Sequence, residues 1–182
     1  MDTYYDTGTL IPLYVDEIFS GAVTDYTASC GVPIPFSLFH RLEFENALRL
    51  KLFRKDMNQG QYLAILKKVE MNISDGMLVF RPVNWIEAFD KARSIGADVT
   101  AKTGCRTLDL IHVAIAVQWG CPTFLTADER QLAAAKMAGL CTVDLRKLHQ
   151  KRGDGRGYSG VIREKQAKYG RSPRKRGGNR NT

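Results

Sequence analysis

Four acidic residues stand where they could together bind a cation. Asp6 follows two tyrosines in Y-Y-D-T-G-T, and Asp128 follows the apolar segment T-F-L-T. Asp109 and Glu43 interrupt otherwise apolar stretches. A carboxylate in apolar surroundings is costly unless it is paired or bound to a metal ion. If the four acids converge, a divalent cation relieves their repulsion, and oxygen-only ligands suit Mg²⁺ or Mn²⁺.

Each of these acids also has a purely structural interpretation. Asp109 is expected in the first turn of a helix, where the helix dipole favours a negative charge. Asp128 is suited to cap the N-terminus of a helix. Glu43 could pair with a nearby arginine, and Glu45 could as easily be the functional acid. The metal-site hypothesis therefore depends on the fold bringing the acids together.

The triplet Asp6-Thr7-Gly8 also occurs in aspartic proteases. Such a protease needs two of these aspartates, from two lobes or from a dimer, on an all-β frame. Helices expected over residues 37–53 and 107–119 contradict that frame. The sequence also lacks a Ser-His-Asp or Cys-His set. His112 is expected to pack and orient a carboxylate, whereas His40 and His149 are expected at the surface.

The elements that would position the acids alternate between short apolar strands and helices. Ser37 is expected to cap a helix with Phe39, Leu42, Asn46, Leu50 and Phe53 on its face, and Thr107 to cap another. This alternation predicts an α/β fold, a three-layer α/β/α sandwich with a short central parallel sheet. Functional groups gather at the carboxyl ends of such strands. Strands are expected at 3–6, 32–36, 77–82, 123–126 and 141–144, and further helices at 9–17, 20–29, 61–72, 85–95 and 128–137.

Composition predicts one domain with a basic tail. The 182 residues are 44% hydrophobic and carry a formal charge of +8. Residues 151–182 hold eleven Lys or Arg against two acids and seven of the sixteen glycines, so the preceding residues are nearly neutral. We expect residues 150–182 to be mostly disordered, with a short helix over 161–169, and to attract RNA.

Targeting and cysteine patterns favour an ordinary cytoplasmic protein. No apolar run is long enough to span a membrane, and the start M-D-T-Y-Y-D has no secretory features. The four cysteines form no C-x-x-C pair and have no histidine at ligand spacing, so we expect small buried thiols rather than a zinc site.

Four stretches, in order, resemble PIN-domain ribonucleases of the VapC toxin type. They are Y-Y-D-T-G-T-L-I-P-L-Y (4–14), R-L-E-F-E-N-A-L-R-L-K (41–51), R-T-L-D-L-I-H-V-A-I-A (106–116) and F-L-T-A-D-E-R-Q-L-A-A-A-K-M-A-G-L (124–140). The resemblance implies a PIN-like nuclease domain over residues 1–149. It also implies that Mg²⁺ or Mn²⁺ is held by Asp6, Glu43, Asp109 and Asp128. Glu43 matches rather than Glu45, because the family acid lies three residues before Asn46.

The resemblance further implies a mechanism and partners. Metal-activated water would cleave RNA phosphodiester bonds, leaving a 5′-phosphate, with Thr7, Arg106 and Thr126 as substrate-binding residues. Gly8 departs from the family, which often has Ser or Asn there. VapC-type toxins bind an antitoxin and form homodimers, so both partners are expected, with no membrane contact. The alternative is a catalytically inactive PIN-fold module that binds RNA through its basic tail.

Overall fold

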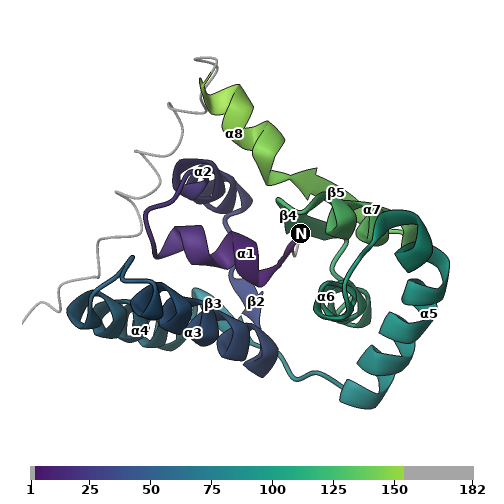
Figure 1. Ribbon diagram of the computed structural model, residues 1–182, viewed down its shortest axis with the longest axis horizontal. Helices are drawn as coiled ribbons and strands as arrows, with labels where there is room; N and C mark the ends of the chain where they lie inside the picture. The colour runs from purple at the N-terminus through teal and green to yellow at the C-terminus, as the bar shows by residue number, and fades with distance from the viewer. Residues whose placement is uncertain (1–2, 154–182) are drawn as a thin grey trace, which may run out of the picture.

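The computed structural model describes residues 3–153 and shows a mixed α/β fold with parallel strands, as predicted (Figure 1). Three strands form one parallel sheet in the order β1-β4-β5, and two others form a parallel pair, β2-β3. The strands are β1 Thr3–Tyr5, β2 Ile34–Phe36, β3 Leu78–Phe80, β4 Thr123–Thr126 and β5 Cys141–Asp144. The α-helices are α1 Thr7–Leu10, α2 Ser20–Cys30, α3 Leu38–Phe53, α4 Gln59–Ser74, α5 Trp85–Thr103, α6 Thr107–Gln118, α7 Glu129–Met137 and α8 Leu145–Gly153.

Side chains alternate between the two faces of the strands and so form two hydrophobic cores, one on each face of the sheet. Tyr4 and Phe124, which are opposite each other in β1 and β4, pack in one core with α5, α6 and α7. Tyr5 and Leu125, the next pair, pack in the other core with α1 to α4 and α8. Because successive side chains of a strand point to opposite faces, a shift of one residue would exchange the two sets. Helices therefore cover both faces of the strands.

Pro35 explains why β2 does not hydrogen-bond to β1, although the two strands lie side by side. The Ile34 N–H donates to Met77 and the Phe36 carbonyl accepts from Arg81, each at 2.8 Å, so both residues face β3. The intervening Pro35 faces β1 and has no N–H to donate. The prolines were expected to exclude this segment from a central ladder, and that expectation is confirmed.

His40 bridges the gap between β1 and α3, and the expectation that it lies at the surface is wrong. Its side chain is fully buried. The Nε2–H donates to the Tyr5 carbonyl at 3.0 Å, and Nδ1 lies 2.8 Å from the Ser37 hydroxyl. Burial, and then the nearby His112, hold the pKa of His40 well below its ordinary value, so the ring is neutral. His149, by contrast, is half-buried and packs edge-on against Phe19.

Helix α3 begins after Ser37, as predicted, but its buried face differs from the predicted one. Ser37 Oγ accepts the His40 N–H, which closes the first turn. The buried side chains are Phe39, His40, Phe44 and Leu48, whereas Asn46, Leu42, Leu50 and Phe53 are exposed. Apolar residues lie on more than one side of this helix, so periodicity did not decide which side would meet the sheet.

Three other helices differ from prediction in their bounds. The segment 9–17 is not one helix, because α1 ends at Leu10 and a 3₁₀ turn, Ile11–Leu13, follows with Pro12 in its first turn. Arg106, not Thr107, is the residue before α6, and Leu108 in its first turn is exposed. Helix α5 runs to Thr103, and Gly104 ends it with a positive φ of 68°.

The C-terminal boundary of the folded part differs from the predicted one. Helix α8 continues to Gly153, so the expected boundary near residue 150 falls inside it. The basic tail beyond it and the expected helix at 161–169 lie outside the described residues. Cys105 and Cys121 are buried as expected, but Cys141 is exposed and Cys30 half-buried. No helix in residues 3–153 is long and apolar enough to cross a membrane.

Candidate metal centre

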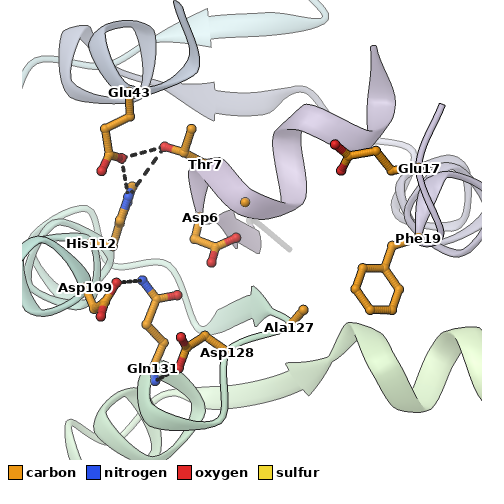
Figure 2. A pocket seen from close by; sticks show the side chains of 11 residues that line it. Asp6, Thr7, Glu17, Phe19, Glu43, Asp109, His112, Ala127, Asp128 and Gln131 are labelled. Carbon is orange, nitrogen blue, oxygen red and sulfur yellow. Dashed lines mark hydrogen bonds and ion pairs between the residues drawn. The ribbon is translucent and has the colours of Figure 1, made fainter. Parts of the chain in front are cut away.

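The four acids line one hollow of about 480 Å³ at the carboxyl ends of β1 and β4 (Figure 2). Asp6 directly follows β1, and Asp128 lies two residues after β4. Asp109 lies in the first turn of α6, and Glu43 lies on α3. The structure thus brings together side chains that are separated by up to 122 positions in the sequence.

Asp6 is the most buried of the four carboxylates and is held by two hydrogen bonds. Its Oδ1 accepts the Thr9 N–H at 2.8 Å, so that Asp6 caps the N-terminus of α1. Its Oδ2 lies 2.7 Å from the Thr126 hydroxyl. Burial raises the pKa of Asp6 despite the opposing effects of His112 and these hydrogen bonds. A buried carboxylate with a raised pKa is the group that a neighbouring cation would stabilise most.

Asp109 and Asp128 are held by hydrogen-bond donors at the starts of two helices, α6 and α7. Asp109 Oδ2 accepts the Arg106 N–H at 3.2 Å, and its Oδ1 accepts from the Gln131 side-chain amide at 3.2 Å. Asp128 is the N-cap of α7, because its Oδ1 accepts the N–H groups of Arg130 at 2.7 Å and Gln131 at 3.2 Å. The structural interpretation of Asp128 is therefore correct, yet its carboxylate also faces the hollow.

Glu43 is fixed by a chain that runs through His112 to Tyr4. Glu43 Oε2 accepts the Thr7 hydroxyl at 2.7 Å and lies 2.6 Å from His112 Nε2. Burial raises the pKa of Tyr4, so its hydroxyl stays protonated, and this hydroxyl lies 2.8 Å from His112 Nδ1. Because the Glu43 carboxylate can only accept, the Nε2–H of His112 donates to it. Desolvation acts to raise the pKa of Glu43, but the interactions with His112 and Thr7 outweigh it and lower the pKa.

Glu45, the alternative to Glu43, does not line the hollow. It pairs with Arg41 at 3.0 Å and with Arg49 at 2.7 Å along α3. Glu45 therefore forms the arginine pairs that the sequence also allowed for Glu43. Glu43 is the acid that faces the candidate site.

Thr126 and Gln131 form a junction between Asp6 and Asp109. The Thr126 hydroxyl lies 2.7 Å from Asp6 Oδ2 and 2.9 Å from Gln131 Oε1, and it accepts the Asp128 N–H at 3.0 Å. A threonine has one hydroxyl hydrogen, so it can donate to only one of these two oxygens at a time. When Asp6 is ionised, the hydrogen points to Asp6, and Gln131 Oε1 loses this donor.

Other residues of the hollow were not anticipated, or differ from expectation. Glu17 lines it but is paired with Lys51 at 2.5 Å, and Phe19 adds an aromatic ring at the opposite side from Glu43 (Figure 2).

Arg106 is exposed and does not line the hollow, although its N–H holds Asp109. At Gly8 a Cβ would lie 3.6 Å from Asp6 Oδ2, so the position has room for a Cβ.

The donor chemistry of the hollow fits a hard divalent cation. The four acids offer only oxygen atoms, as Mg²⁺ and Mn²⁺ prefer. Glu43 Oε1 and Asp128 Oδ2 accept no hydrogen bond from residues 3–153, which leaves both oxygens available. In that same part of the chain, no three Asp, Glu, His or Cys side chains lie close enough to hold a metal ion as they stand. Binding would require the carboxylates to move closer together.

Comparisons with protein-family models and with curated proteins find no match to this chain. The resemblance to PIN domains therefore rests on the four sequence motifs.

Proposed function

We propose that the protein is a Mg²⁺- or Mn²⁺-dependent endoribonuclease with a PIN-like, three-layer fold. The observation that carries this proposal is the convergence of Asp6, Glu43, Asp109 and Asp128 on one hollow at the carboxyl ends of parallel strands. The four PIN-type motifs provide these same four residues. The proposal includes a cytoplasmic location and a toxin role within a toxin–antitoxin pair.

In this proposal the chain's own residues position the reactants. Asp6, Glu43 and Asp109 would hold the ion, and Asp128 would complete the site. When bound, the ion would lower the pKa of a water molecule and neutralise charge on the phosphate. His112 and Thr7 hold Glu43 through its Oε2, which leaves Oε1 available to a ligand. Arg106 is exposed and its backbone N–H contacts Asp109, so its guanidinium is suited to bind a phosphate of the RNA.

The test is cleavage of total RNA with Mg²⁺, with Mn²⁺ or with EDTA. Asp109→Asn should lower the rate by at least about 100-fold, because a direct ligand should matter more than the supporting residues whose loss costs 10–100-fold. Asp98→Asn is the matched control, because Asp98 is exposed on α5 and does not line the hollow. Cleavage that survives both EDTA and Asp109→Asn would refute the mechanism.

A second candidate function is an inactive PIN-like module that binds RNA. It is favoured by the spacing of the acids, since no three metal-binding side chains in residues 3–153 are close enough as they stand. Its basic residues would lie in the tail after Gly153. Truncation after Gly153 separates the candidates, because a nuclease should retain cleavage, whereas a tail-dependent module should lose RNA binding. RNA binding without cleavage in any metal would favour the module.

The expected protein partners have candidate surfaces on α3 and α5. Leu42 and Phe53 on α3, and Ile86 and Phe89 on α5, are large apolar side chains exposed to solvent. Exposed apolar side chains of this kind support a homodimer or a bound antitoxin. Sedimentation of the full chain tests the dimer, and a monomer at all concentrations would contradict it.

A further inference from the structure

Gln131 occupies a position where the helix pattern requires an apolar residue. The buried residues of α7 are Gln131, Ala134 and Ala135, which lie on one face at spacings of three and four. Gln131 is only 3% exposed. Burying a side-chain amide costs free energy unless its groups are hydrogen-bonded. The contacts of this amide therefore indicate why it is there.

Those contacts reach three of the four candidate ligands. The side-chain Nε2 donates to Asp109 Oδ1 at 3.2 Å, and the backbone N–H donates to Asp128 Oδ1 at 3.2 Å (Figure 2). The Oε1 lies 2.9 Å from the Thr126 hydroxyl, which also contacts Asp6 Oδ2. Gln131 thus links the ends of β1 and β4 with the starts of α6 and α7, directly or through Thr126.

We propose that Gln131 is a positioning residue that sets the separation of Asp109 and Asp6 for binding of a divalent cation. The inference rests on the proposed function for the identity of the ligand. Asp109 has two hydrogen-bond donors in residues 3–153, the Arg106 N–H and the Gln131 amide. Without the amide, Asp109 Oδ1 loses its donor and the carboxylate is held only through Oδ2. Thr126 also loses its contact with Gln131 Oε1, so that only Asp6 and the Asp128 N–H remain as its hydrogen-bond partners among residues 3–153.

Gln131→Met tests the amide while keeping the length and much of the volume of the side chain. The matched control is Gln118→Met, since Gln118 lies at the other end of α6 from Asp109, about 13 Å along the helix. Its Nε2 donates to the Asn84 carbonyl at 2.9 Å and to Glu87 at 3.1 Å, and it does not line the hollow. Both substitutions remove one hydrogen-bonded amide, but only Gln131 contacts the candidate ligands.

The experiment is calorimetric titration of the full-length, metal-free protein with Mn²⁺, together with thermal unfolding in EDTA. We expect Gln131→Met to weaken Mn²⁺ binding by about tenfold or more, as supporting residues of metal sites do. Gln118→Met should leave the affinity unchanged. Thr126→Val should also weaken binding, and the two effects should not add, because both residues belong to one network.

Unchanged Mn²⁺ affinity in Gln131→Met, with or without a loss of stability, would overturn the inference and leave the proposed function intact. Failure of the wild-type protein to bind Mn²⁺ would overturn both. If Gln131→Met does not fold, Gln131→Asn takes its place, since its amide is one methylene too short to reach both partners. Wild-type affinity in that variant would equally refute the positioning role.

Discussion

Replacing Asp6 by asparagine should stabilise the metal-free protein while removing its response to metal. In the ionised form, Asp6 is a buried charge, and the single Thr126 hydrogen is directed to it rather than to Gln131. An asparagine would keep the Thr9 N–H on its oxygen and donate its own N–H to Thr126 Oγ1. The Thr126 hydroxyl would then donate to Gln131 Oε1 at 2.9 Å. The substitution therefore gains one hydrogen bond and loses one buried charge.

The gain in the free energy of unfolding can be estimated from these two changes. One net hydrogen bond contributes about 1 kcal/mol, and removal of the buried charge acts in the same direction. We expect the free energy of unfolding to rise by about 1–2 kcal/mol, with about 2–4 °C in Tm for each kcal/mol. Saturating Mg²⁺ should raise the Tm of the wild-type protein through linkage, but not that of Asp6→Asn.

The pH dependence of this difference follows from the raised pKa of Asp6. A carboxyl group whose pKa is higher in the folded state destabilises the protein as pH rises through that pKa. The advantage of Asp6→Asn should therefore be largest at neutral pH and should shrink at acidic pH, as Asp6 takes up its proton. Urea unfolding in EDTA at neutral and at acidic pH measures it, with Asp98→Asn as the exposed control. A variant less stable than wild type near neutral pH, or an advantage independent of pH, would refute the reasoning.

Two further predictions test the support of Glu43 and the packing of α3. Tyr4→Phe leaves His112 Nδ1 without its hydrogen-bond partner and should lower the free energy of unfolding by about 1–3 kcal/mol, seen as a lower urea midpoint. An unchanged midpoint would show that the Tyr4–His112 hydrogen bond contributes nothing. Leu48→Ala, at a fully buried position on α3, should cost about 2–5 kcal/mol, whereas Leu42→Ala, at a position 64% exposed, should cost no more than about 0.5 kcal/mol. Equal effects would contradict the observed orientation of α3.

The candidate site was only partly predictable from the sequence. Asp6 and Asp128 were placed at strand ends because short apolar runs predict strands, and functional groups lie beyond the carboxyl ends of parallel strands. That Glu43 rather than Glu45 would face the site came from the resemblance, and the ion pairs of Glu45 with Arg41 and Arg49 give the physical reason. Gln131 was missed, although its place on the buried face of α7, in line with two alanines, was a detectable signal.

The sequence by itself determined the local structure: the Ser37 cap, the order of strands and helices, and the acids among apolar residues. These features depend on neighbours within a few positions, such as the Ser37 and His40 pair that closes the first turn of α3. Only the tertiary structure decided which side of α3 is buried, that His40 bonds to β1, and that Thr126 and Gln131 connect Asp6 with Asp109. Those outcomes depend on contacts across 22 to 120 positions, which no local pattern encodes.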